Sequence, residues 1–157
     1  MFVIRKRRSI MRFLQVFRLP KHIEGQGVCL AARTRPLWRL FLTPLSQGCF
    51  TLEFEIRPAD RKERLGRMEL LVDTQDPKQV EIGMRIEDSH QGQGLGTRAL
   101  HLIEPFLAGA LGVEFVTVRV REDNARGRTF AEKAGYRTAG NGADGMIHFT
   151  KRIGYSG

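Results

Sequence analysis

The sequence predicts a single mixed α/β domain, in which helices flank a mostly antiparallel sheet. Apolar and polar residues alternate over 50–57 and 113–120, a pattern typical of strands with one face in water. Apolar residues recur at helical spacing over 95–111, which indicates one long amphipathic helix. Short polar turns separate the strands that precede this helix, and strands joined in that way usually pair antiparallel.

The elements follow one another without a repeat or a second domain. Seven strands are expected, at 27–32, 50–57, 67–72, 80–87, 113–120, from Tyr136, and at 146–153. Helices are expected from Arg35-Pro36 to Phe41, over 95–111 and over 125–134. Strand 113–120 follows a helix, so we expect it to lie parallel to strand 80–87 through a right-handed crossover.

The long helix contains Pro105, and an interior proline usually kinks or breaks a helix. Its apolar stripe nevertheless continues in phase past the proline, so one helix bent outward is expected. The stripe comprises Leu95, Ala99, Leu102, Ile103, Phe106, Leu107, Ala110 and Leu111. Gly112 and Gly135 are expected to end the two later helices.

Charge is concentrated at the start of the chain. The net charge is +9, and residues 1–12 carry five basic side chains and no acidic one. We expect residues 1–20 to be a basic arm, solvated and disordered, and residues 21–157 to form the domain. The alternatives are an arm that binds nucleic acid or anionic lipid, an organelle transit peptide, and a true start at Met11.

Cys29 and Cys49 lack the spacing of a metal site, and no histidine is close to them in a metal-binding pattern. We therefore expect no metal, two free thiols and a cytoplasmic location. No run approaches the roughly 20 apolar residues of a membrane span, so no membrane contact is expected.

A turn rich in glycine joins strand 80–87 to the long helix. Gly92, Gly94 and Gly96 permit a tight turn and close approach of a ligand, while the free N–H groups of the helix point back at the turn. This combination predicts an anion site, most often for phosphate. A Walker A loop is excluded because its lysine is absent. A dinucleotide site does not fit either, because the strands before the turn look antiparallel and the expected acidic residue would fall near Glu114.

The flanking residues carry a family resemblance. Gln91–Gly96 resembles the Gln/Arg-x-x-Gly-x-Gly/Ala signature of the GNAT acetyltransferase superfamily, and 81–86 resembles its central strand. The segment from Asn124 to Tyr136 resembles its second motif, a short helix ending in Glu-Lys-x-Gly-Phe/Tyr. The resemblance, from about residue 27 to the end, implies a sheet splayed between the fourth and fifth strands, with acetyl-CoA as cosubstrate in the gap.

The resemblance also implies which residues contact acetyl-CoA. Its pantetheine arm would pair with the central strand, and its pyrophosphate would take backbone N–H groups of the turn. The implied contacts are Met84, Ile86, Gln91, Gly92, Gln93, Gly94, Leu95, Gly96, Thr97, Asn124 and Phe130. A backbone N–H at a strand bulge near 84–86 would polarise the thioester.

Glu81 on the central strand is the expected general base by this resemblance, against the alternative of a solvated strand residue. Other candidate bases, or binders of a cationic substrate, are Glu53, Glu55 and Glu69. The tyrosine that many relatives use as leaving-group acid corresponds here to Ala131. Water or a backbone donor could help the thiolate leave; otherwise catalysis is weak or absent.

The sequence thus predicts an acetyl-CoA-dependent N-acetyltransferase that modifies a primary amine of a small molecule or a protein. The chain would be a monomer or a homodimer, and the short segment 34–48 suggests an open acceptor site. Two alternatives remain: a non-catalytic acyl-CoA-binding protein, and a nucleic-acid- or ribosome-associated module that uses residues 1–12.

Overall fold

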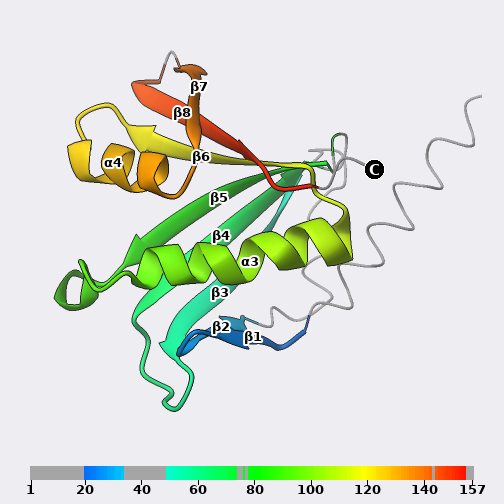
Figure 1. The fold of residues 1–157 in the computed structure, drawn as a ribbon, viewed down its shortest axis with the longest axis vertical. Helices are drawn as coiled ribbons and strands as arrows, with labels where there is room; N and C mark the ends of the chain where they lie inside the picture. The colour runs from blue at the N-terminus through cyan, green and yellow to red at the C-terminus, as the bar shows by residue number, and fades with distance from the viewer. Residues whose placement is uncertain (1–19, 34–48, 74–75, 77, 143, 155–157) are drawn as a thin grey trace, which may run out of the picture.

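The computed structural model describes residues 20–33, 49–73, 76, 78–142 and 144–154. The expected arm up to residue 19, the expected helix at 35–41 and the segment 34–48 lie outside the described residues. The described chain forms one mixed sheet of eight strands flanked by two longer helices (Figure 1). The strands are β1 (His22–Gly25), β2 (Val28–Ala32), β3 (Cys49–Pro58), β4 (Gly66–Asp73), β5 (Gln79–Ile86), β6 (Phe115–Arg121), β7 (Arg137–Asn141) and β8 (Met146–Arg152).

The strand order is β1-β2-β3-β4-β5-β6-β8-β7, and every neighbouring pair except β5–β6 is antiparallel. This confirms the predicted class and the parallel β5–β6 pair. The prediction of seven strands missed β1. That strand is an edge strand of four residues, too short to give a clear alternating pattern. It pairs with β2 through a turn at Gln26 and Gly27, both with positive φ, as two-residue hairpin turns often require.

The sheet opens in its middle. Strands β5 and β6 are paired only from Gln79–Phe115 to Ile82–Val118, after which each continues alone to Ile86 and Arg121. Figure 1 shows the two strands diverging beyond this point. The predicted splay between the fourth and fifth expected strands is therefore present, between β5 and β6.

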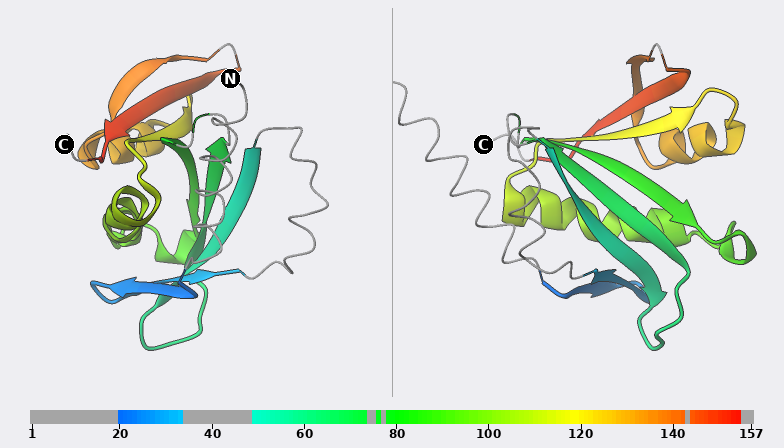
Figure 2. Two further views of the ribbon diagram at one scale, coloured as in Figure 1. Left: turned by 90° about the vertical axis from the view of Figure 1, so that its right-hand side faces the viewer. Right: turned by 180° about the vertical axis from the view of Figure 1, so that it is seen from behind.

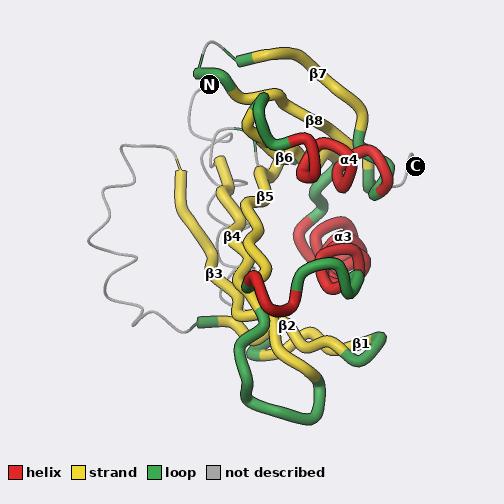
Figure 3. The backbone as a smooth tube through the Cα atoms, turned by 90° about the vertical axis from the view of Figure 1, so that its left-hand side faces the viewer, coloured by secondary structure: helices red, strands yellow, loops and turns green. Residues whose placement is uncertain are grey.

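The helices α3 (Leu95–Leu111) and α4 (Ala125–Lys133) lie on one face of the sheet, with α4 beside the outer part of β6 (Figure 3). A 3-10 turn at Asp88–His90 precedes the glycine turn. Pro105 lies within a single helix, as predicted, and Gly112 ends α3 in the left-handed conformation. On the opposite face no described helix covers the strands (Figure 2).

The buried side of α3 differs from the predicted stripe. Leu100 and Glu104 face the core, whereas Ala110 is exposed and Leu102 and Phe106 are only partly buried. The stripe is rotated because α3 packs beneath the opening of the sheet as well as beside the β1–β2 hairpin. Glu104, which is only 8% exposed, was not expected in the core.

Glu104 is buried because two other side chains satisfy it. Tyr136 Oη donates to Glu104 Oε1 at 2.8 Å, and Lys151 Nζ donates to Glu104 Oε2 at 2.7 Å and to the Ala134 carbonyl at 3.0 Å. Tyr136 follows α4 and Lys151 lies on β8, so this cluster joins α3 to the part of the sheet beyond the opening. Burial, together with the Glu104 charge, raises the pKa of Tyr136 far above its ordinary value.

Candidate functional site

A cavity of about 700 Å³ occupies the space between the diverging strands, the glycine turn and α4. Its wall is more apolar than polar. It is lined by Ile82, Met84, Arg85, Ile86, His90, Gln91, Gly92, Gly94, Leu95, Gly96, Thr97, Leu100, Val118, Arg119, Val120, Arg121, Asn124, Arg126, Gly127, Phe130, Ala131, Lys133 and Met146. Every predicted coenzyme contact is among these residues except Gln93.

The glycine turn leaves the start of α3 open. Gly92 and Gly94 have φ values of +79° and +71°, which residues with a Cβ rarely adopt. Gly94 is the N-cap of α3, and no side chain caps the helix there. The first N–H groups of α3 have no intrahelical acceptor and face the cavity end, where the helix dipole favours an anion. No acidic residue lies in the first turn to compete for them.

The two glutamines of the turn help to hold it in place, Gln91 through its side chain and Gln93 through its backbone carbonyl. The Gln91 amide donates to the Ile86 carbonyl at 3.0 Å and to Asp88 at 2.9 Å, and its oxygen accepts from Arg126 at 2.8 Å. These bonds tie the turn to the end of β5 and to α4. Gln93 lies outside the cavity, and its carbonyl accepts from Arg98 at 3.0 Å. Because the Gln91 side chain is engaged in this way, backbone groups of the turn are the groups that it leaves for a ligand.

Gly96 sits where two side chains converge on the first turn of α3. A Cβ at this position would lie 3.1 Å from Met84 Cε and 3.1 Å from the ring edge of Phe130. Glycine thus allows a side chain of β5 and one of α4 to approach the helix together. Met84 from β5 and Phe130 from α4 therefore come together above Gly96, at the start of α3.

Asn124 caps α4, since its side-chain oxygen accepts from the Gly127 N–H at 2.9 Å. A Cβ at Gly127 would lie 2.7 Å from Asn124 Nδ2 and 2.8 Å from Val120. Tight packing of α4 against its N-cap residue and against β6 therefore explains the glycine inside this short helix. Asn124 still lines the cavity, so its capping role and a contact with a ligand are compatible.

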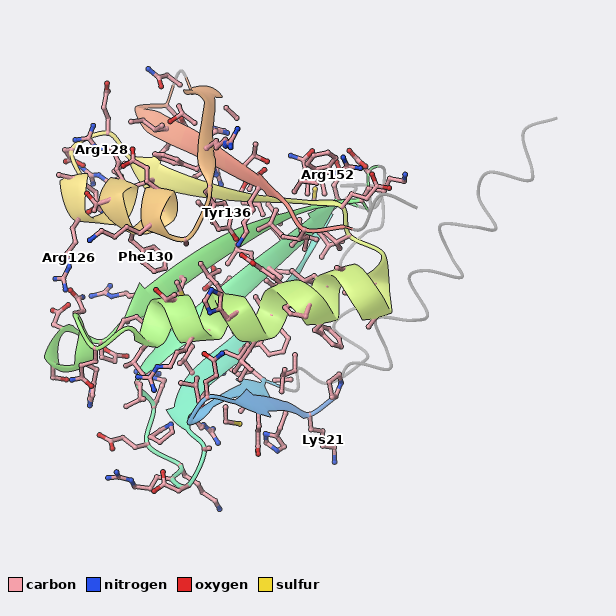
Figure 4. All side chains as sticks on the ribbon, viewed as in Figure 1. Lys21, Arg126, Arg128, Phe130, Tyr136 and Arg152 are labelled. Carbon is pink, nitrogen blue, oxygen red and sulfur yellow. The ribbon has the colours of Figure 1, made fainter. Side chains whose placement is uncertain are left out.

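Cations border the cavity on the α4 side. Arg126 and Lys133 come from α4, while Arg119 and Arg121 come from β6. Figure 4 shows Arg126 and Phe130 pointing from α4 toward the glycine turn and the gap. Arg119 bonds Glu81 and Arg121 bonds Asp123, so a ligand with several phosphate oxygens would find charge of the right sign mainly on the α4 part of this border.

Glu81 lies at the point where β5 and β6 separate, but on the face of the sheet opposite α3. Its neighbours Val80 and Ile82 are buried in the core, and side chains alternate between faces along a strand. The Glu81 carboxylate accepts from Arg119 Nε at 2.7 Å through Oε1. Among the described residues, no second group bonds its Oε2. The carboxylate is thus oriented by Arg119 through one of its two oxygens.

The expected bulge near 84–86 is absent. The β4–β5 register runs without a shift from Gly66–Ile86 to Val72–Val80, so this was a wrong prediction for the described residues. Regular pairing with β4 keeps β5 straight up to Ile86. Its other edge is unpaired beyond Ile82, and the backbone groups on that edge are the ones exposed to the gap.

A second hollow of about 410 Å³ lies on the same face as Glu81. Thr117, which lines it, is the register partner of Glu81 and accepts from Gln79 Nε2 at 3.1 Å. Most of the remaining lining comes from the β7–β8 side, where Asn141, His148 and Thr150 supply its polar side chains. Sequence reasoning missed this hollow, because it depends on how β7 and β8 pair.

Comparison with known families gives a decisive match. The model of the "Acetyltransferase (GNAT) domain" matches residues 1–137. The chain belongs to the GNAT acetyltransferase family. A search of curated proteins finds no significant match to this sequence.

Solved structures agree with the GNAT fold. One is described as a probable GNAT-family acetyltransferase from Chromobacterium violaceum, with 18% identity, 85% of this chain and 87% of that chain covered, and a TM-score of 0.68. Another is the spermidine N-acetyltransferase from Vibrio cholerae in complex with CoA and spermine. It shares 13% identity, with 82% of this chain and 97% of that chain covered, and a TM-score of 0.65. At these identities the likeness concerns the fold alone.

For this GNAT protein the described residues offer no tyrosine at the cavity. Ala131, at the position that the sequence motif indicated for such a group, is 1% exposed and lines the cavity. Tyr136 is committed to Glu104 and lies outside the lining. Tyr155 lies outside the described residues. A tyrosine acid is therefore missing from the described wall.

Cys29 and Cys49 are free thiols, as predicted. The expectation that no histidine lies near them is wrong, since His22 Nδ1 is 3.8 Å from Cys29 Sγ. Within the described part of the chain, no helix combines the length and the apolar character needed to cross a bilayer.

Proposed function

We propose that this protein is an acetyl-CoA-dependent N-acetyltransferase that modifies a primary amine. The observation that carries the proposal is the cavity between β5 and β6, which runs from an open helix N-terminus to Ile82 and Arg119, where the two strands separate and Arg119 bonds Glu81. Acetyl-CoA would use both ends. Its anionic pyrophosphate would bind at the helix N-terminus, and its thioester would lie at the other end, where it must reach the acceptor. The two free cysteines suit a reducing compartment, and we propose the cytoplasm.

The glycine turn and the first turn of α3 would bind the pyrophosphate. Leu95, Gly96 and Thr97 would supply N–H donors, and Arg126 would add a charge-assisted contact. The unpaired edge of β5 would bond the amides of the pantetheine arm as a further strand would. Met84, Ile86 and Phe130 would form the apolar wall along that arm.

Glu81 would act as the general base, directly or through one water, and Arg119 would hold the carboxylate in position. Glu81 takes a proton from the acceptor amine, and the freed nitrogen attacks the thioester carbonyl carbon. A C–N bond forms, the C–S bond breaks, and the CoA thiolate leaves and takes a proton from solvent. The acceptor would approach from the face that carries Glu81 and the hollow beside Thr117.

One observation favours a second candidate, a protein that binds acyl-CoA without turnover. The described cavity has no tyrosine to protonate the leaving thiolate, and Ala131 stands at the relevant motif position. This candidate shares the coenzyme site with the first and differs from it only in the chemical step.

The test is release of the CoA thiol from acetyl-CoA by the full chain across an amine panel. The panel holds polyamines, since the Vibrio cholerae neighbour is a spermidine N-acetyltransferase, together with small monoamines and peptides with free N-termini. Amine-dependent release supports the first candidate. Saturable binding of acetyl-CoA with no release for any amine supports the second.

A further inference from the structure

The β1–β2 hairpin brings three side chains with metal-binding atoms to one place outside the cavity. These are His22 and Glu24 on β1 and Cys29 on β2. Their ligand atoms all lie within 4.8 Å of one another. Elsewhere in the described ranges no other group of three or more such residues is found.

The register of the hairpin explains the convergence. His22 and Glu24 are two residues apart, so their side chains lie on the same face of β1, and Glu24 is the direct partner of Cys29 on β2. Glu24 and Cys29 lie opposite each other, and His22 is the diagonal neighbour of Cys29, so the three side chains form a compact triangle. Sequence spacing alone hides this group, because the thiol comes from the next strand.

The distance between the histidine and cysteine ligand atoms fits a tetrahedral ion. His22 Nδ1 and Cys29 Sγ are 3.8 Å apart. Ligands at about 2.3 Å (sulfur) and 2.0–2.1 Å (nitrogen) from a tetrahedral Zn²⁺ would be about 3.6 Å apart. A thiolate, an imidazole and a carboxylate together are a donor set that suits zinc better than calcium or magnesium.

We propose that His22, Glu24 and Cys29 form a Zn²⁺ site on the β1–β2 hairpin, with a water molecule as fourth ligand. The site lies apart from the proposed coenzyme cavity, none of whose lining residues belongs to this hairpin. On binding, Cys29 loses its proton to solvent and becomes a thiolate ligand, while His22 binds as the neutral imidazole.

Charged groups next to the three ligands affect the charge balance of the proposed site. Burial and the Glu24 carboxylate raise the pKa of the Cys29 thiol, whereas Arg57, its partner on β3, opposes that effect. Arg57 is itself paired with Glu55 on the same strand, so its charge is partly neutralised. The thiolate and the Glu24 carboxylate would offset the charge of one divalent ion.

The hairpin is connected to the glycine turn. Arg98 on α3 donates to the Gln26 carbonyl at the hairpin turn (3.2 Å) and to the Gln93 carbonyl (3.0 Å). An ion that crosslinks β1 to β2 would therefore stabilise the hairpin, which Arg98 connects to the glycine turn. We expect zinc to raise the stability of the fold, because a ligand that binds only the folded chain stabilises it.

The experiment is calorimetric titration of the chelator-stripped full chain, free of any histidine tag, with Zn²⁺. One equivalent is expected to bind with a rise in melting temperature, and Co²⁺ in its place should show the absorption of a thiolate ligand. His22→Gln and Glu24→Gln, both at exposed positions, should each weaken Zn²⁺ binding, with His22→Gln losing about 100-fold or more. Cys29→Ser should abolish the thiolate absorption.

Matched controls are Cys49→Ser and His101→Gln, which change an exposed cysteine and an exposed histidine elsewhere. Both should bind Zn²⁺ as the unchanged chain does. Absence of one-equivalent binding in the unchanged chain would overturn the proposal. Binding that survives His22→Gln and Cys29→Ser, or that is lost in Cys49→Ser, would also overturn it.

Discussion

The two ends of the cavity between β5 and β6 consist of different parts of the chain, backbone at one end and side chains at the other. The end at the glycine turn consists mainly of backbone, with glycines at Gly92, Gly94 and Gly96 and an uncapped helix start. At the other end Arg119 lines the cavity and holds the Glu81 carboxylate, which lies on the opposite face of the sheet, as does the hollow beside Thr117. The first kind of site depends on local chain conformation, whereas the second depends on how distant strands meet.

This difference separates binding from chemistry in the proposed enzyme. Changes at the turn should weaken binding of acetyl-CoA. Changes at Glu81 should slow acetyl transfer and leave binding intact. A third group, around Glu104, should affect neither and only stability. The following substitutions test this separation, from the largest expected effect to the smallest.

Glu81→Gln keeps the shape of the side chain and removes its ability to accept a proton at neutral pH. We expect the rate of acetyl transfer to fall about 100-fold or more, because general-base catalysis contributes at least that much. Acetyl-CoA affinity by calorimetry should stay the same. Of the alternative bases Glu53, Glu55 and Glu69, we choose Glu69, which is exposed on β4 on the same face of the sheet as Glu81. If Glu69→Gln loses the transfer rate and Glu81→Gln keeps it, Glu81 is not the base.

Gly96→Val places a branched side chain where a Cβ already meets Met84 and Phe130 at 3.1 Å. The new methyl groups should displace these side chains into the cavity, so we expect acetyl-CoA affinity to fall by about 10- to 100-fold. The matched control is Gly109→Val on the same helix, where a Cβ would meet nothing within 4 Å. Equal affinity losses in both variants would contradict a specific role for Gly96.

Tyr136→Phe removes the hydroxyl that donates to Glu104 and leaves a buried carboxylate oxygen without that donor. We expect the free energy of unfolding to fall by about 1–3 kcal/mol, measured by denaturant titration. Acetyl-CoA affinity should not change, since Tyr136 lies outside the cavity lining. A change in affinity without a change in stability would place Tyr136 in the coenzyme site instead.

Glu55→Gln should have the smallest effect and should depend on pH. The hydrogen bond from Arg57 holds the pKa of Glu55 below its ordinary value of 4.5 in the folded protein. The stabilisation is therefore present above pH 4.5 and is lost as pH falls through the lower folded-state pKa. We expect Glu55→Gln to cost about 1 kcal/mol or less at pH 7, and less than that in acid. A stability difference that grows on acidification would contradict this assignment.

The sequence was sufficient for the parts of the fold that local patterns determine. The long helix across Pro105, the glycine turn and the cap at Asn124 each follow from neighbouring residues, and all three are present. The short edge strand β1 was missed because four residues give little periodicity.

Pairs of distant residues were not predictable in the same way. Glu104 was not part of the predicted apolar stripe, and its burial depends on Tyr136 and Lys151, which lie far along the chain and bond its carboxylate. The Glu81–Arg119 pair and the group at Cys29 likewise depend on which strands become neighbours. The expected bulge near 84–86 failed because β4 pairs with β5 regularly to its end.

Titration of the full chain with acetyl-CoA in a calorimeter tests the central claim most directly. We predict saturable binding of one equivalent, a rise in melting temperature with acetyl-CoA concentration, and weaker binding in Gly96→Val than in Gly109→Val. No binding and no shift in melting temperature at saturating acetyl-CoA would contradict the claim that the cavity between β5 and β6 is a coenzyme site.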